Sequence, residues 1–141
     1  MGAGFASILM VLSAGIALAL GVLHLVYTFS GNKLTPRDSS LQARMAQVSP
    51  VITRQTTMWK AWVGFNATHS YGLILFGLVY GYLAVVDREI LFNSPFLLAI
   101  GLAMLGGLLF IAKVYFFSRP FRSVLIATIC YVLSVVVRLS I

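Results

Sequence analysis

Two histidines and their neighbours are the residues of this sequence whose types and spacing are best suited to chemistry. His24 and Tyr27 are about one helical turn apart, and Asn66 and His69 repeat that spacing in a second apolar segment. Imidazole exchanges protons near neutral pH, and polar groups within a bilayer usually face the interior of a helical bundle. We therefore predict a polar pocket between these two segments, with His69 and Tyr27 as candidate catalytic groups.

Aromatic and basic residues flank this polar cluster. Trp59 and Trp62 continue the face that carries Asn66 and His69, at the position where a helix leaves the hydrocarbon. Basic side chains would hold an anionic head group by charge-assisted hydrogen bonds. The ligand expected is an amphipathic lipid or an anionic cofactor, and the predicted binding residues are His24, Arg54, Trp59, Lys60, Trp62, Asn66, Arg119 and Arg122.

Two other interpretations of the histidines remain open. The polar residues could simply form hydrogen bonds between helices, as in many membrane bundles. His24 and His69 could hold haem b, although counting from the helix ends places them at depths that differ by about 9 Å, at roughly 1.5 Å per residue. A metal site is not predicted, because the three acids, Asp38, Asp87 and Glu89, lie outside the apolar segments.

The composition excludes a water-soluble domain. Of the 141 residues 60% are hydrophobic and 9% are charged, whereas soluble domains carry about 25% charged residues. The mean hydropathy of +1.00 also excludes disorder. The single cysteine, Cys130, excludes an internal disulfide and is expected to be an inert core residue. No soluble basic module is present, so the net charge of +7 indicates membrane orientation and lipid head groups rather than nucleic acid.

Four apolar segments predict an all-α fold, a transmembrane four-helix bundle in one domain covering residues 1–141. A span needs about 20 helical residues, and the predicted spans are 3–29, 58–86, 95–117 and 121–137. The first is expected to remain as a permanent helix, because no positive region precedes it. Pro120 is expected to interrupt the chain between the last two spans. Aromatic belts at the interfaces are predicted from Tyr80, Tyr82, Tyr115, Phe116 and Phe117.

The polar segment 30–57 between the first two spans predicts a short helix lying in the membrane interface. Thr35 followed by Pro36 and Asp38 resembles a capping box, which would start this helix near Thr35. Its apolar face would carry Leu41 and Met45. Ser49-Pro50 is a second start signal, which predicts that the helix of the second span begins near Val51.

Basic residues indicate the orientation. The segment 30–57 and the turn near 118 share one side in a four-span topology, and this side holds Lys33, Arg37, Arg44, Arg54, Lys60, Lys113, Arg119 and Arg122. The other side holds Arg88 and Arg138. The positive-inside rule therefore predicts a cytoplasmic loop and both termini outside. Gly77-x-x-x-Gly81 and Ala103-x-x-x-Gly107 predict close helix contacts within the bundle or between subunits.

The stretch 33–72 resembles a bacterial family of small four-span integral membrane proteins without an assigned activity. The resemblance rests on Lys-Leu-Thr-Pro-Arg-Asp at 33–38, Ile-Thr-Arg at 52–54, Thr-Met-Trp-Lys-Ala-Trp at 57–62 and Gly-Phe-Asn at 64–66. It implies a multi-pass protein of the bacterial inner membrane.

The layout is also similar to the membrane-associated proteins in eicosanoid and glutathione metabolism. Those proteins have four spans, a basic first loop, and a trimeric assembly with glutathione between subunits. Their second helix carries an asparagine followed by a glutamate three residues later, where this sequence has Asn66 and His69. Ala112–Tyr115 with Arg119 and Arg122 resembles their basic last connection. This resemblance implies a homo-oligomer, a trimer in that family, and a glutathione-like thiol as cofactor.

A non-enzymatic role is the main alternative to a lipid-binding or catalytic protein. Few residues lie outside the spans, and no complete catalytic constellation is present. These features also fit an accessory or assembly subunit of a larger membrane complex.

Overall fold

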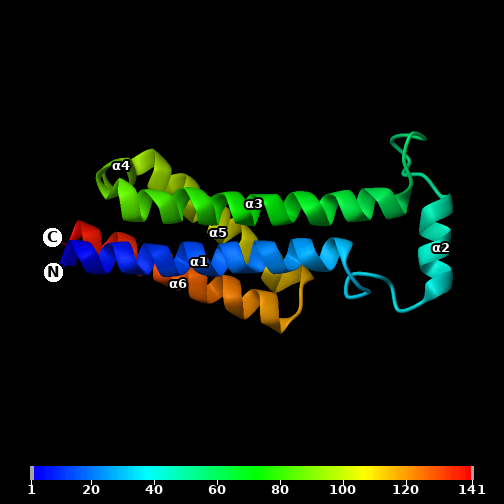
Figure 1. The fold of residues 1–141 in the computed structure, drawn as a ribbon, viewed down its shortest axis with the longest axis horizontal. Helices are drawn as coiled ribbons and strands as arrows, with labels where there is room; N and C mark the ends of the chain where they lie inside the picture. Colours follow the sequence, from blue (N-terminus) through cyan, green and yellow to red (C-terminus); the bar gives the residue numbers. More distant parts are fainter. Residues whose placement is uncertain (1, 141) are drawn as a thin grey trace. The chain divides into compact units, whose positions relative to one another are not determined.

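The computed structural model describes residues 2–140, with side chains from Gly4 onward, and every regular element in this part of the chain is an α-helix (Figure 1). The helices are α1 (Gly2–Phe29), α2 (Ser39–Gln47), α3 (Met58–Val86), α4 (Arg88–Asn93), α5 (Pro95–Tyr115) and α6 (Ser118–Leu139). The prediction of an all-α fold with a short helix between the first two spans is confirmed.

Four of these helices are long and apolar enough to cross a membrane, namely α1, α3, α5 and α6. Large apolar side chains such as Phe5, Leu75 and Phe110 are exposed on them. Outward-facing apolar side chains suit a lipid environment, where a helix satisfies its own backbone groups. The bounds of α3 agree with the predicted second span.

The connection between α5 and α6 differs from the prediction. Pro120 does not interrupt the chain but lies in the first turn of α6, which begins at Ser118 instead of Phe121. The first backbone N–H groups of a helix have no partner within it, so a proline costs little there. The break falls instead at Phe116 and Phe117, which are extended.

The chain divides into two compact units. Unit 1 comprises the described parts of Met1–Leu20 and Leu73–Ile141, and unit 2 comprises Gly21–Gly72. The first part of α1 and the second part of α3 thus belong to unit 1 together with α4, α5 and α6. The start of α1 and the end of α6 lie at the same end of unit 1 (Figure 1).

Hydrogen bonds from side chains to backbone carbonyls connect the helices of unit 1. The Tyr80 hydroxyl donates to Leu97 O at 2.6 Å, the Tyr131 hydroxyl donates to Leu98 O at 2.9 Å, and Ser134 Oγ donates to Ala6 O at 2.6 Å. Tyr80 is buried and packs against Phe76 and Tyr131, so its assignment to an aromatic belt was wrong. Its hydroxyl donates to a backbone carbonyl inside the bundle, so Tyr80 can be satisfied without lying at the membrane interface.

Helices α1 and α3 approach closely at Gly77. A methyl group added there would lie 2.6 Å from Leu18 Cβ and 2.7 Å from Ala14 O, so only glycine fits this crossing. The prediction of a close contact at Gly77-x-x-x-Gly81 is confirmed within the chain. Gly107 of the second motif has nothing within 4 Å of an added methyl group.

The connection between α3 and α5 contains a short helix, α4, where the sequence predicted a turn. The Asp87 carboxylate accepts the Ile90 N–H at 3.2 Å and caps this helix. Leu91 and Phe92 are buried in the core of unit 1. Glu89 and Arg138 form an ion pair at 3.1 Å, which ties α4 to the end of α6.

We expect Gly77→Ala to lower the free energy of unfolding by about 1–3 kcal/mol, because the added methyl group overpacks the crossing of α1 and α3. Gly64→Ala on the same helix is the control, since nothing lies within 4 Å of a methyl group there. Denaturant unfolding in detergent, followed by tryptophan fluorescence, measures both. Equal stability of the two variants would contradict the close approach at Gly77.

Candidate functional site

Unit 2 holds the segments of the first two spans between which a polar pocket was predicted. It consists of the end of α1, helix α2 and the start of α3, and α2 runs across the direction of the two long helices (Figure 1). This direction fits a helix in the membrane interface. Helix α2 begins at Ser39, so the predicted start near Thr35 was wrong. Asp38 is the residue that caps it, since its carboxylate accepts the Ser40 N–H at 2.8 Å, whereas Thr35 Oγ1 donates to Asn32 O.

Helix α3 begins at Met58, so the prediction of a start near Val51 was also wrong. Val51 and Ile52 lie in a fully exposed turn. The helix starts where Thr57 Oγ1 accepts the Lys60 N–H at 3.3 Å. The Thr57 hydroxyl thus satisfies one of the first backbone N–H groups of α3, which have no partner within the helix.

His24, Asn66 and His69 come together in unit 2. The His24 Nε2–H donates to Asn66 Oδ1 at 3.0 Å, and the ring centres of the two histidines are 5.2 Å apart in an edge-to-face arrangement. The depth difference of about 9 Å, counted at roughly 1.5 Å per residue, was therefore wrong. Helix α3 extends past the end of α1, so counting residues from the two helix ends does not compare equal depths (Figure 1).

These histidines do not fit the haem alternative as arranged. Axial ligands of one haem iron stand on opposite faces of the macrocycle, whereas the rings of His24 and His69 are in direct contact. The Nε2 atom of His24 is moreover used by Asn66. Among the described residues no three His, Cys, Asp or Glu side chains are grouped so that they could hold a metal ion.

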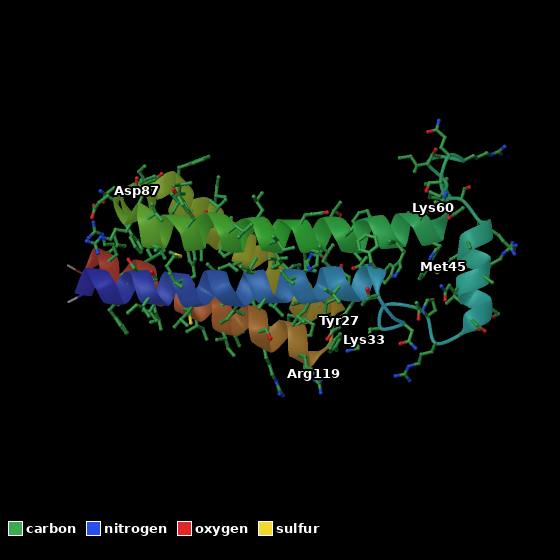
Figure 2. The ribbon with its side chains drawn as sticks, in the orientation of Figure 1. Tyr27, Lys33, Met45, Lys60, Asp87 and Arg119 are labelled. Carbon is green, nitrogen blue, oxygen red and sulfur yellow. The ribbon has the colours of Figure 1, made fainter. Side chains whose placement is uncertain are left out.

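The turn after α1 returns the chain over the end of that helix. Gly31 has φ of +80°, a conformation that side chains with a Cβ rarely adopt. The Lys33 Nζ then lies 4.1 Å from the centre of the Tyr27 ring. Figure 2 labels both residues, near the end of α1. Trp62 Nε1–H donates to Leu34 O at 2.9 Å and holds this return segment on α3.

A pocket of about 300 Å³ lies between these segments. Trp59, Trp62 and Val63 line it from α3, and Tyr27 and Thr28 line it from α1. Further lining comes from Phe29, Gly31, Leu34, Thr35, Gln42 and Asn66. The pocket thus combines flat aromatic surfaces with hydroxyl and amide groups, which is the composition of a site for a molecule that is both apolar and polar.

Four of the predicted site residues line this pocket: Tyr27, Trp59, Trp62 and Asn66. His24 and His69 do not line it, although His24 is hydrogen-bonded to Asn66, which does. Arg54 and Lys60 are exposed and do not line it either. Arg119 and Arg122 are exposed at the start of α6 in unit 1.

Sequence reasoning missed Lys33 and Gln42 as site residues. Lys33 follows Gly31 by two residues, and a glycine directly after a helix is a recognisable signal for a reversal of the chain. Gln42 lies on α2, whose position no local pattern could give. The hydrogen bonds of Trp62 and the cap at Asp38 fix that position.

The four spans and the apolar surface define the chain as a small polytopic membrane protein. No family model, curated protein or solved structure matches it.

We expect α2 to unwind reversibly at low pH. The Ser40 hydroxyl, followed by the Ser40 N–H, donates to the Asp38 carboxylate and lowers the pKa of that group. A depressed pKa means that the cap is fully present above the unfolded value of about 3.9 and is lost as the pH falls through the lower, folded value. NMR chemical shifts of residues 39–47 will report the loss below about pH 4.

Asp38→Asn is the matched control for this titration, because an amide caps a helix without titrating. Its α2 shifts should stay constant over the same pH range. A wild-type α2 whose shifts do not respond to acid would contradict the capping role of Asp38.

Proposed function

We propose that this protein binds an amphipathic lipid whose polar head occupies the pocket of unit 2. The observation that carries this proposal is the lining of the pocket, in which Trp59 and Trp62 stand beside the hydroxyl and amide groups of Tyr27 and Gln42. Tryptophan prefers the head-group level of a membrane, where a lipid head is also found.

The side chains that can bond to a ligand differ from those whose hydrogen bonds connect the helices. Asn66 uses Oδ1 to accept from His24 and Nδ2 to donate to Trp62 O. In the described part of the chain the Tyr27 hydroxyl and the Gln42 amide make no hydrogen bond. These two groups are the donors offered to a ligand, and Lys33 beside Tyr27 supplies the cation for an anionic head.

Binding is favoured over catalysis by the same geometry. Of the two candidate catalytic residues, Tyr27 lines the pocket, whereas His69 packs against His24 and does not. A tyrosine hydroxyl without a base beside it does not make a complete catalytic site. In the family that the layout resembles, a glutamate occupies the position of His69, so a glutathione-like thiol would lack that carboxylate here. We therefore assign a binding role and place the ligand at Tyr27 and Gln42.

We further propose that the pocket faces the cytoplasm and that both termini lie outside a bacterial inner membrane. The support is the distribution of Lys and Arg, with eight on the side of segment 30–57 and two, Arg88 and Arg138, on the other.

We expect Val63→Trp to abolish lipid retention by filling the pocket. The matched control is Phe65→Trp on the same helix, which is 79% exposed and does not line the pocket. Each variant is purified in mild detergent, and mass spectrometry of the extracted small molecules identifies what remains bound. Gln42→Leu, which removes a donor without filling the pocket, should reduce the same signal.

Circular dichroism shows whether the variants keep their helices. Loss of a defined amphiphile from Val63→Trp, with a reduced amount in Gln42→Leu and full retention in Phe65→Trp, supports the proposal. Equal lipid content in all variants, or no defined amphiphile in the wild type, would overturn it.

A second candidate function is that of an assembly subunit, either in a homo-oligomer or in a larger membrane complex. The observation that favours it is the small-residue surface of α5. Methyl groups added at Gly106 or Gly107 meet nothing within 4 Å, so this surface is open to close packing by another helix.

We expect the protein to migrate as a discrete homo-oligomer if this α5 surface packs on a second copy. Gly107→Leu should then convert it to a monomer without loss of helix, because the larger side chain prevents close approach. Native mass spectrometry from detergent measures the mass. A wild-type monomer would contradict self-association, and a mass that requires other chains would indicate an accessory subunit.

A further inference from the structure

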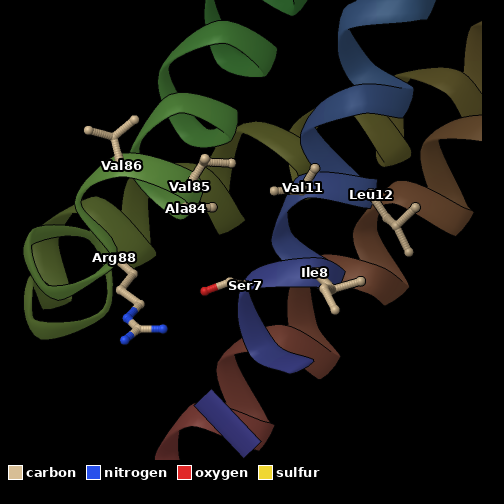
Figure 3. A pocket seen from close by; sticks show the side chains of 8 residues that line it. All are labelled: Ser7, Ile8, Val11, Leu12, Ala84, Val85, Val86 and Arg88. Atoms are coloured by element: carbon tan, nitrogen blue, oxygen red, sulfur yellow. The ribbon is translucent and has the colours of Figure 1, made fainter. Parts of the chain in front are cut away.

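Unit 1 contains a second cavity, which the proposed function does not use. Its volume is about 550 Å³, within the range of roughly 300–1,000 Å³ found for small-molecule sites. Ile8, Val11 and Leu12 of α1 form one wall, and Val85 at the end of α3 contributes to the other (Figure 3). These walls are apolar over more than one helical turn and can accommodate an acyl chain.

The mouth of this cavity carries an uncompensated cation. Arg88 begins α4 directly after the span of α3, which places its guanidinium at the head-group level. Neither neighbouring acid forms an ion pair with it: Asp87 caps α4, and Glu89 bonds to Arg138 and Asn93. Arg88 forms no ion pair among the described residues.

A hydroxyl group faces the same space. Ser7 Oγ is inaccessible to water and has no hydrogen-bond partner in the described chain. A buried hydroxyl without a partner costs free energy, and a ligand atom that bonds to it would recover that cost. Figure 3 shows the Ser7 hydroxyl and the Arg88 guanidinium directed into one opening from α1 and α4.

We propose that this cavity is a binding site for an anionic phospholipid, separate from the pocket of unit 2. One acyl chain lies between α1 and α3, the phosphate bonds to Arg88, and a glycerol or phosphate oxygen accepts from Ser7 Oγ. An unpaired guanidinium above an apolar groove combines the charge and the shape that a phospholipid presents.

The test uses native mass spectrometry of the purified, delipidated protein. Phosphatidylglycerol and phosphatidylcholine with identical acyl chains are added separately, and inorganic phosphate is added as a competitor. We expect one phosphatidylglycerol to bind about fivefold more tightly than phosphatidylcholine, the effect of roughly one basic side chain at a membrane surface. Phosphate alone should not compete, since it lacks the acyl chain.

Arg88→Gln should remove this preference, whereas the matched variant Arg138→Gln should keep it, because Arg138 is already paired with Glu89. Val85→Trp, at a residue 71% exposed, should fill the groove and abolish the bound lipid. Leu75→Trp, on the same helix but outside the cavity, controls for a bulky substitution. Equal affinity for both lipids, or an unchanged preference in Arg88→Gln, would overturn the proposal.

Discussion

In the hydrocarbon of a membrane every polar group needs a partner within the protein, because no water is available to supply one. The polar side chains that connect the helices of both units follow that constraint. In unit 1 the hydroxyls of Tyr80, Tyr131 and Ser134 donate to carbonyls of neighbouring helices. In unit 2 Asn66 bonds at once to His24 and to its own helix at Trp62 O. Side chains that look chemically active in the sequence are thus occupied in holding helices together.

The same constraint explains why the candidate sites lie near the ends of the spans. Close to the head groups, water and lipid can satisfy polar atoms, so groups without a partner in the chain are tolerated. The Tyr27 hydroxyl and the Gln42 amide are such groups in unit 2, and the Arg88 guanidinium is one in unit 1. A binding function is therefore better placed at these positions than at the two histidines, although the histidines are the more conspicuous residues of the sequence.

Hydropathy was sufficient to predict the four spans, and the predicted second span, 58–86, agrees with α3, although that helix was expected to begin near Val51. The termini of other helices were predicted less well, because several capping residues compete in a polar segment. Thr35, Asp38 and Ser49 each could start a helix, and the choice of Asp38 depends on the hydrogen bond to Ser40 and on where Trp62 holds the loop. Pro120 looked like a break because its position within the first turn of α6 was not visible in the sequence.

The approach of His24 to His69 was the least predictable part of the candidate site. Their separation depends on how far α3 extends past the end of α1, which is set by a connection of 28 residues from 30 to 57 rather than by either helix. Sequence spacing gave the correct helix faces, since Asn66 and His69 do meet His24. It could not give the offset of α1 and α3 along their axes, because no local sequence pattern determines that offset.

The balance of charge favours lipid as the partner of both candidate sites. The sequence has ten Lys and Arg residues and three acids. Asp38 and Asp87 cap helices, and Glu89 forms the one ion pair of the described residues, with Arg138. The remaining cations find no acidic partner in the described chain, and those at the membrane surface are attracted to anionic head groups. Arg88 and Lys33 differ from the other basic residues because Arg88 lines one cavity and Lys33 contacts Tyr27, which lines the other. A lipid whose head group is neutralised by either cation would therefore also have a defined place for its apolar part.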